Sequence, residues 1–98
     1  MRLSNFYKET IKLIGREIFG QYTQIYLFGS RTDDAKRGGD IDLYLEVVDK
    51  NDPLLFDKKI QFLVQLNKIL GEQKIDVVIS KDKNRPIEQI ALREGIVL

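Results

Sequence analysis

Two segments with the character of β-strands, residues 40–48 and 75–79, flank one long amphipathic segment. Apolar residues recur in that segment every three or four positions, which is typical of a helix that buries one face: Leu55, Ile60, Leu63, Leu66 and Leu70. Asp52 and Pro53 predict the start of this helix, as an N-cap followed by proline in the first turn, and Gly71 predicts its end. A helix of this length between two strands favours a right-handed parallel crossover. We therefore expect the two strands to be parallel neighbours.

The rest of the sequence predicts two further helices and one further strand. Ser4 is a candidate N-cap for a first helix, and residues 86–94 form a short helical pattern that opens with proline. The aromatic and β-branched run at residues 24–28 predicts a strand. Residues 96–98 predict an extended tail.

Together these elements predict a single domain over residues 1–98, an α/β domain of the α+β type with a two-layer, mixed three-stranded sheet and helices. Asp40, Asp42 and Asp76 lie at the beginnings of the two parallel strands, so they meet at one edge of the sheet. The Gly29–Ser30 pair ends the first strand and reaches that edge only if this strand runs antiparallel to the second. A mixed sheet therefore gathers all five residues in one place.

The composition limits the chemistry available at this edge. The chain lacks histidine and cysteine, which excludes serine–histidine and cysteine–histidine nucleophile systems and an ordinary zinc site. Any metal must be bound by oxygen, as Mg²⁺, Mn²⁺ and Ca²⁺ are. The net charge of +1 argues against direct nucleic-acid binding. No apolar run is long enough to cross a bilayer and no signal-peptide pattern is present, so we expect a cytoplasmic protein without a membrane partner.

Asp40 and Asp42 are two positions apart at a strand start, so their side chains leave the strand on the same face. Two adjacent carboxylates raise each other's pKa unless a cation neutralises them. A divalent ion can do so while it accepts phosphate oxygens in its remaining positions. The alternative for this pair is a solvated Asp-x-Asp turn, which is common.

Asp76 interrupts an apolar strand that we expect to be central and covered. An unpaired carboxylate buried there costs on the order of several kcal/mol, so a partner is required. A metal ion is one candidate for that partner. The alternatives are a lysine or arginine at the sheet edge, or a strand that is only half covered.

Gly29 and Ser30 end an apolar strand abruptly. Glycine lets a phosphate approach the main chain closely, and serine adds a hydroxyl donor. Arg31, Lys36 and Arg37 follow in the next turn and offer positive charge to a triphosphate. A Gly-Ser pair alone also occurs in many turns without any ligand.

The order of these motifs resembles the signature of the DNA polymerase beta–like nucleotidyltransferase superfamily. That signature is an apolar strand with Gly-Ser, a spacer, and Asp-x-Asp, as in residues 27–31 and 39–43, and its third carboxylate matches Asp76. The resemblance covers nearly the whole chain and looks like the minimal nucleotidyltransferases, including antitoxins that are paired with HEPN-domain proteins. The spacer, residues 31–39, is one residue shorter than is typical of that branch.

The resemblance implies Mg²⁺-dependent transfer of a nucleoside monophosphate, AMP from ATP, to a hydroxyl of a HEPN-type partner. It implies two Mg²⁺ ions, with Mn²⁺ as a substitute, and three residues that are both metal ligands and catalytic: Asp40, Asp42 and Asp76. It implies that the phosphates of ATP or another nucleoside triphosphate are bound by three further residues: Gly29, Ser30 and Arg31. Larger relatives have a second domain, and we expect a partner protein to complete the site here.

Two alternatives remain open. A catalytically inactive subunit of the same fold could neutralise its partner by binding alone, through apolar residues of the last helix and tail such as Ile87, Ile90 and Val97. A structural Ca²⁺- or Mg²⁺-binding module would explain the aspartates, but it would not explain Gly29–Ser30 and the basic turn.

Overall fold

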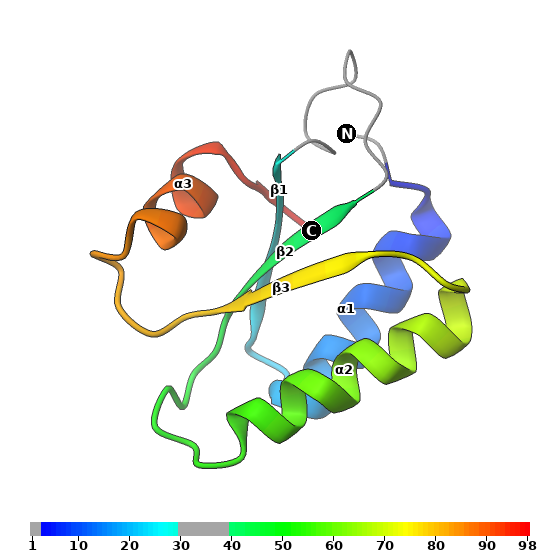
Figure 1. Ribbon diagram of the computed structural model, residues 1–98, viewed down its shortest axis with the longest axis horizontal. Helices are drawn as coiled ribbons and strands as arrows, with labels where there is room; N and C mark the ends of the chain where they lie inside the picture. The colour runs from blue at the N-terminus through cyan, green and yellow to red at the C-terminus, as the bar shows by residue number, and fades with distance from the viewer. Residues whose placement is uncertain (1–2, 30–39) are drawn as a thin grey trace.

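The computed structural model describes residues 3–29 and 40–98 of the chain. In this part of the chain, three helices and four strands follow one another in an α/β order (Figure 1): α1 Asn5–Phe19, β1 Gln24–Phe28, β2 Ile41–Glu46, α2 Leu55–Leu70, β3 Ile75–Ile79, α3 Pro86–Glu94 and β4 Ile96–Val97. None of the described helices is long and apolar enough to cross a membrane.

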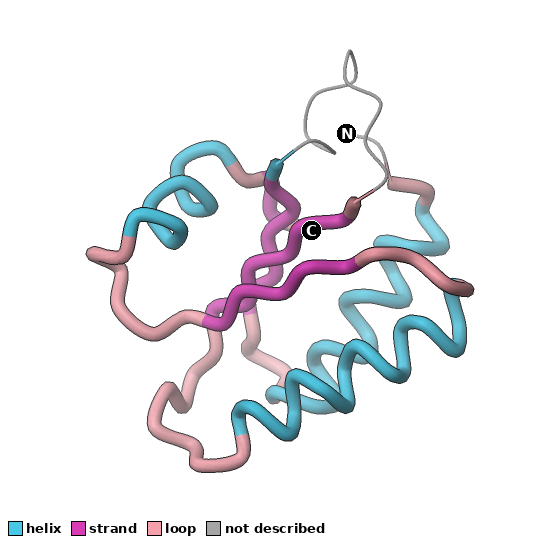
Figure 2. Tube along the Cα trace, in the orientation of Figure 1, coloured by secondary structure: helices cyan, strands magenta, loops and turns pink. Residues whose placement is uncertain are grey.

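The strands form one mixed sheet in the order β3-β2-β1-β4. β2 and β3 are parallel, whereas β1 runs antiparallel to both β2 and β4. This confirms the predicted fold class, the parallel crossover through α2 and the antiparallel direction of the first strand. The tube in Figure 2 shows β1, β2 and β3 side by side, with helices on both sides of them.

The predicted strand count of three is wrong, because the C-terminal tail forms a fourth strand. Ile96 pairs with Leu27 and Val97 pairs with Tyr26, and the Leu98 N–H donates to the Ile25 carbonyl over 2.9 Å. Leu98 is only 9% exposed, since its side chain joins the main core. Burial of this apolar side chain gives a short, otherwise weak strand a reason to dock.

The two faces of the sheet bury different cores. Alternate residues of β1, β2 and β3 point toward α1 and α2 and form the main core with them; among its members are Ile11, Leu27, Leu43, Phe62, Leu66 and Val77. The opposite face carries a smaller cluster that α3 covers, made of Phe28, Tyr44 and Ala91 with Tyr26, Val78 and Leu92. The predicted two layers are thus joined by a partial third layer, because α3 lies on the other face of the sheet.

The helix ends follow from local hydrogen bonds. Ser4 is the N-cap of α1, as predicted, and its hydroxyl accepts from the Tyr7 N–H over 3.2 Å. The predicted N-cap at Asp52 is wrong: its carboxylate accepts from the Leu54 N–H over 2.8 Å and forms an ion pair with Lys58, in a turn that precedes α2. Gly71 ends α2 with φ 85°, as predicted.

Candidate active site

Strand register brings the predicted acidic residues to one face of the sheet. Phe28 of β1 lies opposite Asp42 of β2, and Asp42 lies opposite Asp76 of β3. The three side chains therefore form a row across three strands, on the face that α3 also contacts. Asp40 lies one residue before β2, and Gly29 directly follows Phe28. The sheet thus brings together the described members of the predicted site.

Asp42 is the centre of this row, and its pKa shows the local balance of charge. Partial burial is the largest cause that raises the pKa of the Asp42 carboxyl, followed by repulsion from Asp76 and Asp40 and by a hydrogen bond with Asp76. Lys74 opposes the shift by its positive charge. Carboxylates that repel each other in this way are a site where a bound cation would be favourable.

Lys74 is a residue of this site that the sequence argument did not single out. Its Nζ lies 3.6 Å from the Asp40 carboxylate, and its carbonyl accepts from the Ile41 N–H over 3.0 Å. Because β2 and β3 are parallel and Ile41 is in register with Ile75, Lys74 falls opposite Asp40. The predicted crossover places Lys74 and Asp40 at neighbouring strand starts, and the observed register pairs them.

Gly29 has a conformation and a neighbour that explain the glycine. Its φ is +78°, which side chains rarely adopt. A Cβ atom built there would lie 2.3 Å from the Asp42 Oδ2 atom. The main chain at the end of β1 therefore passes directly against the Asp42 carboxylate, and a larger residue would displace it.

The burial expected for Asp76 is wrong. β3 is an edge strand, and Asp76 is exposed on it. The sequence pattern Ile-Asp-Val-Val-Ile suggested a covered strand because its other residues are apolar, but Ile75 and Val77 point to the main core while Asp76 points to the other face. The free-energy cost of a buried carboxylate therefore gives no argument for a metal partner of Asp76. The argument comes instead from the strand register, which places the Asp76 carboxylate beside that of Asp42.

Ser30 and Arg31, and the basic residues Lys36 and Arg37, lie outside the described residues. The predicted phosphate-binding role of Gly29 is described only through its backbone conformation and its approach to Asp42.

The donor chemistry of this edge fits a hard divalent cation. Three carboxylates offer oxygen atoms and excess negative charge, which Mg²⁺ prefers to nitrogen or sulfur ligands. Within residues 3–29 and 40–98, however, no three acidic side chains are arranged as a ready-made metal site. A bound ion would have to draw the Asp40, Asp42 and Asp76 carboxylates closer together.

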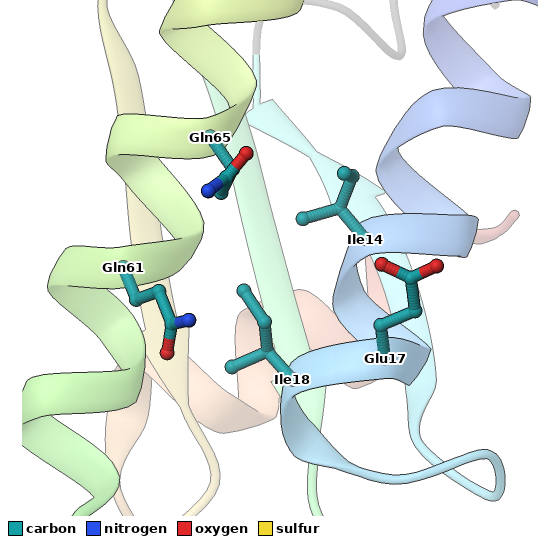
Figure 3. Close-up of a pocket in the computed structure, with 5 residues that line it drawn as sticks. All are labelled: Ile14, Glu17, Ile18, Gln61 and Gln65. Atoms are coloured by element: carbon teal, nitrogen blue, oxygen red, sulfur yellow. The ribbon is translucent and has the colours of Figure 1, made fainter.

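A separate cleft lies between α1 and α2 (Figure 3). It is on the other side of the sheet from Asp40, Asp42 and Asp76, which we call the aspartate row. It has a volume of about 340 Å³, and residues of both helices line it, among them Glu17, Gln61 and Gln65. It shares no lining residue with the aspartate row and is not part of the candidate active site.

The raised pKa of Asp42 leads to a prediction about stability in metal-free buffer. Because the folded state holds the Asp42 proton more tightly than the unfolded state, protonated Asp42 stabilises the fold below about pH 3.9, the usual aspartate pKa. That stabilisation is lost as the pH rises through the raised pKa. We expect Asp42→Asn to be more stable than the wild type at pH 7 without divalent cations, by less than about 1 kcal/mol because the site faces water.

Urea denaturation at pH 4 and pH 7 in a chelator measures this difference. The advantage of the variant should grow between the two pH values, and saturating Mg²⁺ should reduce it by stabilising only the wild type. A variant that is less stable than the wild type at pH 7 without metal would contradict the assigned electrostatics.

The chain is similar to known proteins in sequence and in fold. Residues 9–98 match the family described as polymerase beta, nucleotidyltransferase. This match spans most of the chain, and the protein belongs to that family. No curated protein sequence is significantly similar to the chain.

Several solved structures have the same fold, and two of them come from toxin–antitoxin systems. One is a chain of a mutant MntA–HpeT toxin–antitoxin complex, with a TM-score of 0.70 and 22% identity over 93% of this chain and 69% of the other. Another belongs to a complex of a tri-AMPylated Shewanella oneidensis HEPN toxin with an MNT antitoxin, with a TM-score of 0.71 and 20% identity over 97% and 71% of the two chains. A third, also from Shewanella oneidensis, has a TM-score of 0.70 and 18% identity over 98% and 71%. At these identities the likeness shows the shared fold.

Proposed function

We propose that this protein is an Mg²⁺-dependent nucleotidyltransferase that moves AMP from ATP to a hydroxyl of a HEPN-type partner protein, and that it is the antitoxin of such a pair. The observation that carries the proposal is the row of Asp42 and Asp76 beside Gly29, in a chain of the polymerase beta nucleotidyltransferase family. A tri-AMPylated HEPN toxin bound to an MNT antitoxin, in one structure with the same fold, supports this choice of donor and acceptor.

Each residue has a proposed role in the transfer. Asp40, Asp42 and Asp76 would hold two Mg²⁺ ions, which would neutralise the triphosphate and lower the pKa of the acceptor hydroxyl. The acceptor oxygen attacks the α-phosphorus, the bond to the β-phosphate oxygen breaks, and pyrophosphate leaves. Asp76 would receive the acceptor's proton, and its exposure on the edge strand β3, where an incoming protein can reach it, supports this role.

The phosphates are proposed to lie against the end of β1. Because residue 29 is a glycine, no side chain separates the main chain there from the Asp42 carboxylate. The side chains of Ser30 and Arg31 would donate to the β- and γ-phosphate oxygens. Lys74 adds positive charge beside Asp40, so it would also favour an anionic substrate there. Positioning and neutralisation of charge supply most of the catalysis in reactions of this kind.

A second candidate is a subunit that silences its partner by binding alone. Ile87 and Ile90 of α3 and Val97 of β4 are 39%, 38% and 55% exposed, so these apolar side chains are available for contact with a partner. The lack of a ready-made metal site among the described residues is compatible with this candidate.

Incubation with α-labelled ATP and a HEPN-type toxin separates the two candidates. We expect label on the toxin only when Mg²⁺ and wild-type protein are both present, and loss of toxin activity that follows the labelling. Toxin that is neutralised equally well without ATP, and without any label, would favour binding alone.

A further inference from the structure

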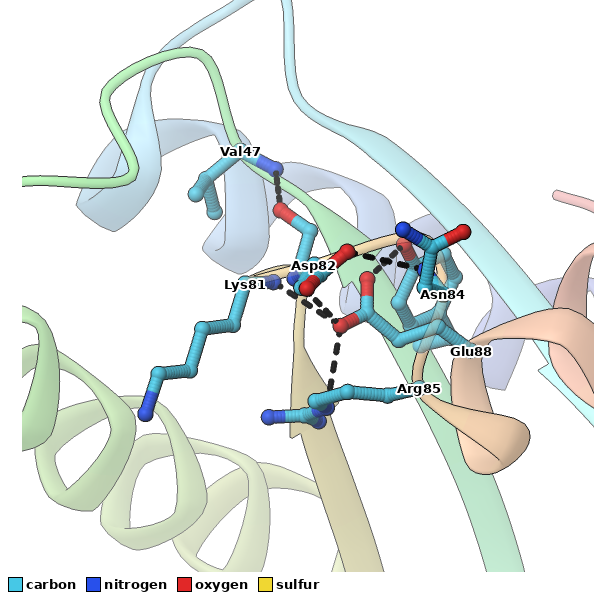
Figure 4. Close-up of polar contacts among 8 residues, drawn as sticks. Val47, Lys81, Asp82, Asn84, Arg85 and Glu88 are labelled. Atoms are coloured by element: carbon cyan, nitrogen blue, oxygen red, sulfur yellow. Dashed lines mark hydrogen bonds and ion pairs between the residues drawn. The ribbon is translucent and has the colours of Figure 1, made fainter.

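Glu88 is a carboxylate in a place where carboxylates are rarely found. Its side chain is 0% exposed, on the face of α3 that packs against the sheet. Figure 4 shows it at the meeting point of the strand ends, the loop after β3 and the start of α3. A buried charge of this kind is tolerated only when it is paired and its lone pairs are satisfied.

Four donors satisfy this carboxylate. Its Oε1 atom accepts from the Tyr44 hydroxyl over 2.7 Å. Its Oε2 atom accepts from the backbone N–H groups of Lys81 and Asp82 over 3.0 Å and 2.8 Å, and lies 3.0 Å from Arg85 Nε. Glu88 thus ties together β2, the loop before α3 and the first turn of α3.

The network keeps Glu88 ionised and Tyr44 protonated. Burial is the largest influence on the pKa of Glu88 and would raise it, but the hydrogen bonds from Tyr44, Asp82 and Lys81 and the charge of Arg85 outweigh burial and hold the pKa below its usual value. Burial, together with Glu88 itself, raises the pKa of the Tyr44 hydroxyl, which therefore remains a donor. The bonds are charge-assisted and stronger than ordinary neutral ones.

This network is linked to the candidate site by two short routes. Tyr44 follows Asp42 by two residues in β2, so both side chains lie on the same face of the sheet. Ala91, one turn after Glu88 in α3, packs with Phe28, which is in register with Asp42 and precedes Gly29. The end of β1 therefore contacts α3 through Phe28, and the start of β2 is linked to Glu88 through Tyr44.

We infer that Glu88 is a positioning residue for the nucleotide site: it fixes α3 on Tyr44, so that Phe28 and Tyr44 hold Gly29 and Asp42 in a constant relation to each other. The inference rests on the proposed function, since it names the residue that prepares the same site for Mg²⁺ and ATP. A fully buried carboxylate with four donors holds one arrangement, whereas an apolar contact alone would let α3 shift.

Glu88→Gln tests this role, because it preserves shape but replaces one acceptor oxygen with an NH₂ group that opposes the donors around it. We expect about a tenfold rise in the Mg²⁺ concentration needed for half-maximal ATP binding, as for other residues that orient metal ligands. Amide hydrogen exchange should also speed up at Lys81 and Asp82. Glu94→Gln is the matched control, since Glu94 is 61% exposed on the same helix, and it should change neither quantity.

Phe62→Leu distinguishes a positioning role of Glu88 from a general loss of stability. It changes the main core, which lies on the other side of the sheet. At a temperature where both variants are folded by circular dichroism, only Glu88→Gln should shift the Mg²⁺ midpoint. Equal Mg²⁺ midpoints for wild type and Glu88→Gln would overturn the inference and leave the proposed function standing. Wild-type protein that binds no ATP at any Mg²⁺ concentration would overturn the proposed function, and the positioning role with it.

Discussion

Replacement of both Asp40 and Asp42 with asparagine is expected to lower nucleotidyl transfer by roughly 10²-fold or more, a loss typical of removing groups that neutralise charge in the transition state. Asparagine keeps the size of the side chain but removes two negative charges that a divalent cation needs. The fold should remain, because Asp40 and Asp42 are only partly buried and contribute nothing to either core. Transfer of labelled AMP and circular dichroism measure the two effects on the same samples.

Asp57→Asn is a suitable control for this double variant. It makes the same chemical change at an exposed position in the first turn of α2. This helix covers the opposite face of the sheet from the aspartate row. It should transfer AMP at the wild-type rate. A double variant that transfers AMP as fast as Asp57→Asn does would remove the aspartates from the mechanism.

Gly29→Ala is expected to abolish Mg²⁺-dependent ATP binding although it adds a single methyl group. Two effects combine at this position. The positive φ costs a side chain about 1–3 kcal/mol of backbone strain. The new Cβ would also meet the Asp42 Oδ2 atom at 2.3 Å, so the carboxylate must move away from the place where we propose that it holds metal.

Gly71→Ala separates strain from displacement. Gly71 has a φ of +85°, similar to that of Gly29, but a Cβ atom there would have no atom within 4 Å. Both variants should lose stability in urea denaturation, and only Gly29→Ala should lose ATP binding in calorimetry. If the two variants bind ATP equally well, the contact between Gly29 and Asp42 has no part in the site.

Much of this architecture could be predicted from local patterns. The sequence pattern of α2 has the length of a crossover helix, and it therefore predicts that β2 and β3 are parallel, as they are. The short connection after β1 allows β1 to pair antiparallel with β2, as it does. These two relations bring the end of β1 and the starts of β2 and β3 together, and the structure adds the register that places Asp42 between Phe28 and Asp76. Element order and strand direction, both of which a sequence can indicate, thus predict which strand ends meet, whereas the exact register comes from the structure.

The parts that could not be predicted depend on long-range packing. Nothing local distinguishes β3 as an edge strand, so the exposure of Asp76 was missed. The tail became β4 because Leu98 found a place in the main core. The sequence around Glu88 does not distinguish it from an exposed helix residue, because its partner Tyr44 is 44 positions away in the chain. In α2, Phe62 rather than Ile60 faces the core, because Phe62 lies on the same face of the helix as Leu66 and Leu70, which are buried with it.

Calorimetric titration of ATP into the purified protein, with Mg²⁺ and separately with a chelator, tests the central claim most directly. It requires no knowledge of the acceptor. We expect binding that needs Mg²⁺ and that disappears in the Asp40→Asn, Asp42→Asn double variant, while Asp57→Asn binds like the wild type. Binding of equal strength in the chelator and in the double variant, or no heat of binding by folded wild-type protein, would contradict a metal-dependent triphosphate site at the edge where Gly29, Asp42 and Asp76 meet.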